Sequence, residues 1–301
     1  MAQTEPFKAT VFIMIGMLTL GLSDNYVRMI SADAGLWQFH ATRAAMTLPL
    51  IIIASGLGLG ALRPKRPLAV LGRSSLIALS MLIYFGCLAF LPIGVVVAGL
   101  FTAPIFVLLI SVLFRGEGIG VLRWCAVAVG FVGALLVIQP TDGSLTALSF
   151  VPIIAGLLYA CGAVATRSWC EGEGTAALVL GFFATLGIFG LLGMAALAIW
   201  PQDVAAGNDG FIARGAVPFT SDFLFWTAVQ ALGAIIGIGC LTKAYQIGEA
   251  SFVAINEYSL IVFASFWAYL IWDETLGWLA VVGIVLIVAS GAVITLRARR
   301  A

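Results

Sequence analysis

The stretch KATVFIMIGMLTLGLSDNYVRMI, residues 8–30, decides what kind of protein this is. After Lys8 it runs mostly through apolar side chains for about twenty residues, the length of α-helix that crosses a bilayer. It lacks a clear small-residue cleavage site, so we expect a spanning helix rather than a cleavable signal peptide. Near its end it carries Asp24, Asn25 and Arg28. Charged groups inside a membrane helix are costly, so these residues are candidates for a function.

The whole chain has the apolar composition of this stretch. Of its 301 residues, 62% are hydrophobic and 10% are charged, whereas soluble domains have roughly 45–50% apolar and about 25% charged residues. The net charge of +1 gives no field that would attract nucleic acid. The five cysteines are scattered without a CxxC motif, and there is a single histidine. We therefore expect an all-α integral membrane protein with buried cysteines and without a multi-histidine metal site.

Ten segments of membrane-spanning length follow one another along the chain. Turn-forming sequences separate them, such as RPKRP at residues 63–67 and QPTDG at residues 139–143. The weakest boundary is at residues 91–94, where a single Pro-Ile-Gly step divides a long apolar run. The predicted spans are residues 8–30, 37–58, 73–91, 94–114, 122–139, 149–168, 175–200, 222–245, 249–271 and 275–296.

The positive residues support this count. If the N-terminus is cytoplasmic, 12 of the 15 Lys and Arg residues fall at cytoplasmic span ends, 2 at outer ends, and only Arg43 inside a span. Arg73, at the start of the third predicted span, is one of the cytoplasmic group. Cytoplasmic loops of membrane proteins are enriched in Lys and Arg, and a wrong count would scramble this sorting. We therefore expect ten spans in the cell (cytoplasmic) membrane, with both termini in the cytoplasm.

The chain divides into two halves of five spans each, residues 1–143 and 144–301. The order of features is alike in both, and their spacing is similar: 28 residues from Ala89 to Glu117, and 30 from Ala244 to Glu274. Because five is an odd number, the second half must enter the membrane from the opposite side. We expect an inverted repeat, an architecture of many secondary transporters, with the substrate bound near the membrane midplane. Two halves with merely similar hydropathy are the alternative.

Several short motifs occur in a fixed order within this ten-span frame. They are Asn25-Tyr26-Val27, Arg43, Pro104, Glu117, Ala244, Ala250-Ser251 and Glu274. Together they resemble the drug/metabolite transporter superfamily, EamA type, over essentially the whole chain. The chain departs from the usual pattern of that family at Asp24, Glu257 and Ile261. The resemblance implies export or exchange of small metabolites, including amino acids.

Polar residues inside the first two spans are candidates for a substrate site. Asp24 and Arg28 are four residues apart and share a helix face, so they pair near the outer interface or leave Asp24 to face a ligand. Asn25 is a further hydrogen-bonding group for such a ligand. Arg43 can bind a substrate carboxylate with two hydrogen bonds, or tether its helix to a neighbouring carbonyl or acid. His40, three residues before Arg43, either takes part in a proton relay or faces interfacial water.

The cluster Asn256-Glu257-Tyr258 falls in the middle third of the ninth predicted span. A carboxyl group at this depth can load and release a proton if it faces a cavity; pairing with Lys243 is the structural alternative. Aromatic residues well inside spans can line a cavity for apolar groups, although lipid-facing aromatics are common. The predicted substrate site consists of Asp24, Asn25, His40, Arg43, Tyr84, Tyr159, Asn256, Glu257 and Tyr258.

The sequence predicts a secondary transporter of small organic metabolites, an exporter or exchanger of amino acids or related compounds that works by alternating access. No P-loop, HExxH or GxSxG motif is present, so ATP hydrolysis and common hydrolase sites are not expected. The expected partners are a small-molecule substrate and membrane lipid, with no cofactor, for a monomer or homodimer. Coupling to protons, to a counter-substrate or to the substrate gradient alone stays open. The alternatives are an intramembrane enzyme with Asp24 and Glu257 as a dyad, and a receptor or channel.

Overall fold

The computed structural model describes residues 5–31, 33–58, 60–87, 91, 93–116, 118–139, 147–204 and 210–298. These residues form helices and loops, and no β-strand occurs among them. Glu117 and most of the predicted junction between the halves lie outside them. The helices are α1 (Pro6–Asp24), α2 (Val27–Ser31), α3 (Leu36–Gly56), α4 (Pro67–Cys87), α5 (Ile93–Leu100), α6 (Ala103–Arg115), α7 (Val121–Ile138), η1 (Ala147–Phe150), α8 (Val151–Ser168), α9 (Thr175–Ile199), α10 (Ser221–Ile247), α11 (Ala250–Glu257), α12 (Ser259–Trp272) and α13 (Trp278–Ala298).

Nine helical stretches of the described residues are long and apolar enough to cross a membrane. The chain is therefore a multi-pass helical membrane protein, as predicted. These stretches match nine of the ten predicted spans. The second predicted span, α3, has 21 residues but is not among the nine, since polar Gln38, His40 and Arg43 lower its hydropathy. The weak boundary at residues 91–94 does separate two helices, because α4 ends before it and α5 begins there.

Three of the predicted spans are each built from two helical pieces. The first span breaks at residues 25–26, the fourth at residues 101–102 and the ninth at Tyr258. Two of these breaks touch: the rings of Phe101 and Tyr258 stack with centroids 5.9 Å apart, and the Tyr258 hydroxyl donates to the Phe101 carbonyl oxygen over 3.3 Å. A broken membrane helix frees backbone groups that need partners inside the protein. The Tyr258 hydroxyl supplies one such partner.

The break in the first span lies between two residues that the sequence predicts to share a helix face. Asp24 is the last residue of α1, whereas Arg28 belongs to α2. Their shared face and their pairing stay predictions.

Helices from the two halves of the chain pack against each other in pairs. The most extensive contacts join α1 with α10, α7 with α13, α3 with α9, and α4 with α8. The α7–α13 pair crosses at Gly133 and Gly283, where a Cβ atom on Gly133 would lie 2.7 Å from the Gly283 carbonyl oxygen. Small residues allow membrane helices to approach this closely. The two halves therefore form one interlocked bundle.

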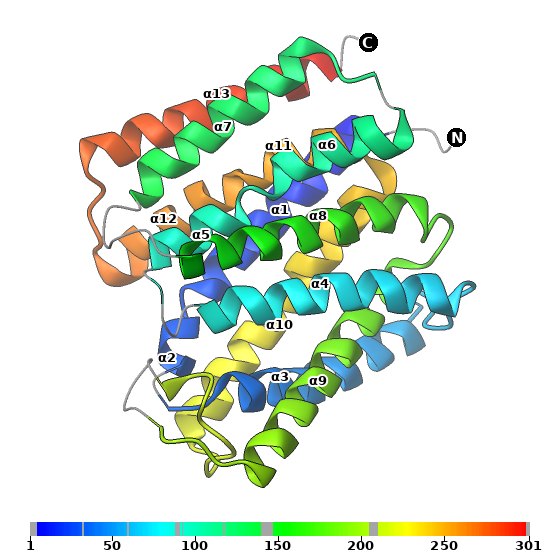
Figure 1. Cartoon of the computed structure of the whole chain (residues 1–301). Helices are drawn as coiled ribbons and strands as arrows, with labels where there is room; N and C mark the ends of the chain where they lie inside the picture. Colours follow the sequence, from blue (N-terminus) through cyan, green and yellow to red (C-terminus); the bar gives the residue numbers. More distant parts are fainter. Residues whose placement is uncertain are drawn as a thin grey trace.

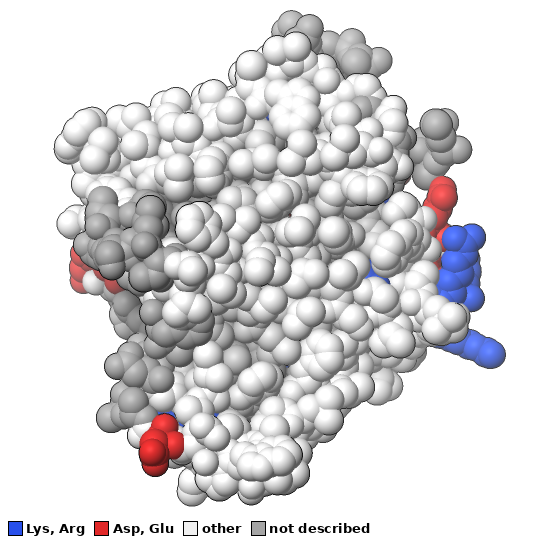
Figure 2. Space-filling view, viewed as in Figure 1, with Lys and Arg blue, Asp and Glu red and all other residues white. Residues whose placement is uncertain are grey.

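Figure 1 shows that α1 begins and α13 ends at the same end of the bundle, on the right of the view. We call this the terminal end, and the other the opposite end. In the view of Figure 2, the visible charged side chains lie along two edges and leave a broad uncharged face between them. This distribution suits a molecule whose sides face lipid and whose two ends face water.

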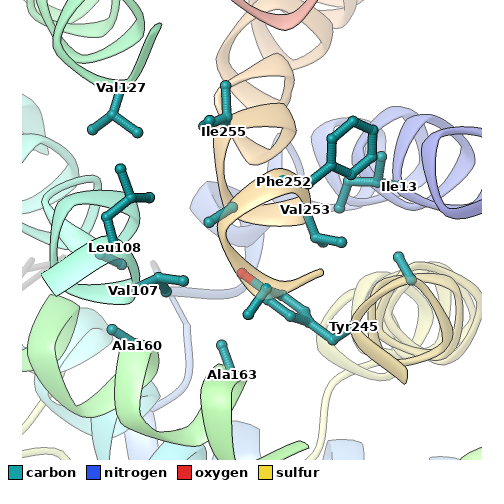
Figure 3. Close-up of a cluster of buried hydrophobic side chains, with 14 of the residues drawn as sticks. Ile13, Val107, Leu108, Val127, Ala160, Ala163, Tyr245, Phe252, Val253 and Ile255 are labelled. Atoms are coloured by element: carbon teal, nitrogen blue, oxygen red, sulfur yellow. The ribbon is translucent and has the colours of Figure 1, made fainter. Parts of the chain in front are cut away.

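An apolar cluster lies near each end of the bundle. At the terminal end, side chains from α1, α6, α10 and α11 converge, and Figure 3 shows Ile13, Val107, Tyr245 and Val253 among them. At the opposite end, α2, α3, α4 and α10 pack together with part of the loop before α10. The buried members of this second cluster are Val27, Ile30, Ala34, Leu36, Phe39, Phe85, Phe211 and Phe223.

Candidate functional site

A cavity of about 140 Å³ lies between the two apolar clusters and is lined by helices from both halves of the chain. Most of its wall is apolar, with Met81, Phe182 and Leu241 among the lining residues. Two acidic and two basic residues also line it: Asp24, Glu257, Arg43 and Arg73. Charged groups inside membrane helices usually face such cavities, because water or a partner can reach them there.

The first polar group of the cavity, the Asp24 cluster, consists of Asp24, Arg43, Tyr84 and Gln230. The Arg43 side chain is 3% exposed and donates from Nη1 to Gln230 Oε1 over 3.1 Å. Gln230 is also a hydrogen-bond partner of Asp24, and Arg43 attracts Asp24 electrostatically. Asp24 itself has exposed side-chain surface at the cavity. The protein thus supplies its own counter-charge for Arg43, which matches the tethering role weighed for it in the sequence.

His40 lies behind this cluster and does not line the cavity. It is fully buried, and its Nδ1 atom is 3.1 Å from Arg43 Nη2. Because an arginine can only donate, Nδ1 accepts and the imidazole is neutral with its proton on Nε2. The His40 ring packs against Phe39 and Phe85 rather than facing interfacial water. In this arrangement His40 orients the guanidinium of Arg43.

The second polar group, the Glu257 cluster, consists of Glu257, Tyr159 and Tyr245. The Tyr159 hydroxyl donates to Glu257 Oε2 over 2.8 Å, and the Tyr245 hydroxyl donates to Oε1. Within the described part of the chain, Glu257 has no ion pair with Lys243, the structural partner considered from the sequence. Two neutral donors therefore hold this carboxyl group in the cavity wall.

The third polar group, the Arg73 cluster, consists of Arg73, Thr166 and Thr242, and all three line the cavity. Arg73 is 3% exposed. Its Nε atom donates to Thr166 Oγ1 over 2.9 Å, Nη2 donates to Thr242 Oγ1 over 3.2 Å, and Nη1 donates to the Leu178 carbonyl oxygen over 3.2 Å. All of these acceptors are neutral. The distribution of positive residues predicts Arg73 at a cytoplasmic span end, whereas the structure places it in the cavity wall.

Some of the cavity residues that were not predicted could have been found from the sequence. α4 begins at Pro67, a residue that suits the first turn of a helix, so Arg73 lies two turns inside rather than at the helix start. Tyr245 is the last residue of the predicted span 222–245, where aromatic residues are common. Gln230, Thr166 and Thr242 offered no signal, because single uncharged polar residues are common in membrane helices.

Five of the nine predicted site residues line the cavity, and four do not. Asn25 donates to the carbonyl oxygens of Gly21 and Ala264, at 2.7 and 3.1 Å, and so joins α1 to α12. Asn256 donates to the Phe252 carbonyl oxygen over 2.9 Å and is buried. Tyr258 makes the contact between helix breaks described above, and His40 supports Arg43. The residues that line the cavity are Asp24, Arg43, Tyr84, Tyr159 and Glu257.

The Asp24 and Glu257 clusters lie toward different ends of the cavity. Their contact residues on α10, Gln230 and Tyr245, are 15 positions apart, which corresponds to about 22 Å of helix. Within the described residues, Asp24 and Glu257 share no hydrogen bond and have different partners. The dyad that an intramembrane enzyme would need is not formed.

Polar contacts cover the opposite end of the bundle. The Gln38 side chain donates to the Val217 carbonyl oxygen and accepts from the Val217 amide, both at 2.8 Å. The indole of Trp37 donates to the Ile212 carbonyl oxygen over 2.9 Å. These bonds hold residues 210–217, part of the loop before α10, against the start of α3.

A separate set of contacts joins the halves at the terminal end. Arg123, at the start of α7, pairs with Glu249 before α11, with 2.8 Å between Nη2 and Oε2. Arg123 also donates to Ser251 Oγ over 3.0 Å. The carboxylate of Glu173 accepts from the backbone amides of Lys65 and Arg66, at 2.9 and 2.5 Å. Contacts between the two halves therefore border each end of the cavity.

Comparison with known proteins identifies membrane transporters as relatives. No protein-family model matches the chain. A riboflavin transporter of Rhizobium johnstonii is 34% identical over 138 residues, covering 46% of this chain and 44% of that protein. The pseudopaline exporter CntI of Pseudomonas aeruginosa is 28% identical over 281 residues, 92% of each chain. An S-adenosylmethionine uptake transporter of Rickettsia prowazekii is 20% identical over 268 residues, 87% of this chain and 84% of that protein.

The overall fold also occurs in a solved structure. A known crystal structure superposes on this chain with a TM-score of 0.74 and 19% identity, over 97% of this chain and 98% of the other. The chain is thus similar along most of its length to bacterial membrane proteins that carry small molecules. These relatives are named as transporters and not as enzymes.

Proposed function

We propose that this chain is a secondary transporter of a small organic metabolite, an exporter or exchanger of an amino acid or related compound. In this proposal it belongs to the drug/metabolite transporter superfamily, EamA type. It has ten spans, namely the nine apolar stretches and α3. These spans are arranged as two inverted repeats of five spans each. The terminal end faces the cytoplasm. The observation that carries the proposal is the cavity between the halves, with charged groups toward both of its ends and an apolar wall between them.

The arrangement of the lining residues supports this substrate class. An amino acid or similar metabolite combines charged groups with an apolar part. Asp24 and Arg43 offer charged contacts toward the opposite end, and Arg73 and Glu257 offer them toward the terminal end. Met81, Phe182 and Leu241 offer apolar contact between them. The named solutes of the relatives, riboflavin, pseudopaline and S-adenosylmethionine, are also small metabolites.

The packing of the helices supports the inverted repeat. If each span of the first half corresponds to the span five places later, α1 corresponds to α8 and α4 to α10. The α1–α10 contact is then equivalent to the α8–α4 contact, and both are among the most extensive in the bundle. The α3–α9 and α7–α13 pairs are each equivalent to themselves, as expected for helices on a two-fold axis. The broken spans at residues 101–102 and Tyr258 correspond in the same way.

Apolar clusters at both ends of the cavity support alternating access. Phe85 belongs to the cluster at the opposite end and also lines the cavity, and Tyr245 does the same at the terminal end. A solute of several ångströms cannot pass either cluster unless its helices separate. If the clusters open one at a time, the cavity is exposed to one side of the membrane and then to the other.

Glu257 is the residue proposed to couple transport to protons. It lies in the cavity wall and is held by two tyrosine hydroxyls, without a cation that would fix its charge among the described residues. We expect Glu257→Gln to abolish proton-driven flux and to leave expression and folding intact, because glutamine has the same size and can still bond to both tyrosines.

Flux into proteoliposomes tests the function. Purified protein is reconstituted, and uptake and exchange of a panel of amino acids, vitamins and nucleosides are measured with and without a pH gradient. Saturable flux of at least one solute is expected, and in wild type it responds to the gradient. Flux of no solute in the panel would contradict a transport function, and normal gradient-driven flux by Glu257→Gln would make Glu257 structural. Glu171→Gln, which changes an exposed acid outside the cavity, is the matched control.

A further inference from the structure

Arg73 is a buried cation that the described part of the protein does not balance. Its three hydrogen-bond acceptors, Thr166, Thr242 and the Leu178 carbonyl group, are uncharged. No carboxylate among the described residues pairs with it. A guanidinium away from water is unfavourable unless a counter-charge joins it. Arg43, equally buried and in the same cavity, has Asp24 for this purpose.

The acids toward the terminal end are already held by other groups. Glu173 accepts from the backbone amides of Lys65 and Arg66. Glu257 accepts from the hydroxyls of Tyr159 and Tyr245. Glu249 pairs with Arg123. A counter-charge for Arg73 must therefore come from outside this set.

The Arg73 cluster has hydrogen-bond donors left for such a group. A guanidinium carries five N–H bonds, and three are used by the protein, one on each nitrogen. One N–H on each terminal nitrogen remains. The Thr242 hydroxyl accepts a hydrogen bond from Arg73. Its own proton has no hydrogen-bond acceptor among the described residues. Two remaining N–H groups beside a hydroxyl suit a carboxylate or phosphate, whose several oxygen atoms can accept more than one hydrogen bond.

We propose that Arg73, with Thr242, binds an anionic carboxylate or phosphate group of the solute in the cavity. The inference rests on the proposed transport function and narrows its substrate class to solutes with an oxyanion. The bound solute is oriented with this group toward the terminal end of the cavity. Its remaining part extends along the apolar wall toward the Asp24 cluster.

Transport of matched solute pairs tests this assignment. The pairs are riboflavin with riboflavin 5′-phosphate, and phenylalaninamide with phenylalanine; the members of each pair differ by one phosphate or one carboxylate. In proteoliposomes, wild type should prefer the member that carries the phosphate or carboxylate in at least one pair. Arg73→Gln should reduce that preference about tenfold or more, as expected for the loss of a charged hydrogen bond. Arg73→Lys should retain part of it, and Arg63→Gln, whose arginine is exposed and does not line the cavity, should keep it.

A binding measurement separates this inference from the transport function. Inorganic phosphate and benzoate are titrated against the purified protein while its thermal unfolding is followed. Stabilisation of wild type by either anion, absent in Arg73→Gln, is expected whether or not the chosen solutes are transported. Flux that favours the members without the phosphate or carboxylate in both pairs, or an anion response unchanged in Arg73→Gln, would overturn the anion site while leaving transport intact. Absence of all flux together with a specific anion response would overturn the transport function alone.

Discussion

The two arginines of the cavity differ in how their charges are balanced. Arg43 lies with Asp24, Gln230 and His40, so protein groups satisfy much of its charge and hydrogen bonding. Arg73 is buried to the same extent, but its hydrogen-bond acceptors among the described residues are all neutral oxygen atoms. The same residue type in the same cavity therefore serves two purposes. A balanced charge holds helices together, whereas an unbalanced one is available to a ligand.

The contacts that cover the two ends differ in a similar way. At the opposite end, the side-chain amide of Gln38 forms two hydrogen bonds with the backbone of Val217. These bonds hold a loop over the start of α3. At the terminal end, the Arg123–Glu249 ion pair joins the start of α7 to the start of α11. Hydrogen bonds of a neutral side-chain amide close one end, and a salt bridge closes the other. Three substitutions test these differences, in decreasing order of expected effect.

Arg43→Gln should have the largest effect on stability. It leaves Asp24 without its positive partner and His40 without its donor. Each buried hydrogen-bonding group that loses its charged partner costs about 1–3 kcal/mol. We expect about 3 kcal/mol here, since Asp24 keeps contact with the cavity. The free energy of unfolding in detergent, measured by denaturant titration, gives the value.

The matched control for this change is the double variant Asp24→Asn/Arg43→Gln. It removes both charges and should recover part of the lost stability, because no isolated charge remains. A single variant as stable as wild type would show that Asp24 and Arg43 do not depend on each other. The comparison between the two arginines would then lose its basis.

The sequence predicted a multi-pass helical membrane protein and nine of its spans correctly because hydropathy depends on the bilayer rather than on packing detail. It also picked out Asp24, Arg43 and Glu257, which line one cavity, since charges within apolar runs are rare. It missed Arg73 because the start of α4 was placed at this residue instead of at Pro67. It included Asn25 and Tyr258, which lie at helix breaks and contact other helices rather than the cavity. Such breaks depend on tertiary contacts that periodicity alone does not reveal.

Gln38→Met should have an intermediate effect, on access to the cavity from the opposite end. Methionine keeps the length of the side chain but loses both hydrogen bonds to Val217, a change of about 1–2 kcal/mol. Opening of the loop should become roughly 5–30 times more frequent. The readout is the rate at which a small water-soluble thiol reagent labels Tyr84→Cys in a background without the five natural cysteines. Gln202→Met, at an exposed position near the same end, is the control, and equal labelling rates in both variants would count against the loop as a cover.

Arg73→Gln should have the smallest effect on stability, and this makes it the sharpest test of the comparison. Glutamine loses some of the three hydrogen bonds of Arg73 but also removes a buried charge without a partner. Replacing buried charge by neutral groups is often close to neutral or stabilising. We expect the unfolding free energy to stay within about 1 kcal/mol of wild type in anion-free buffer. A loss as large as that of Arg43→Gln would mean that Arg73 is a structural tether of α4, α8 and α10, because the hydrogen bonds to Thr166 and Thr242 would then outweigh the cost of the buried charge.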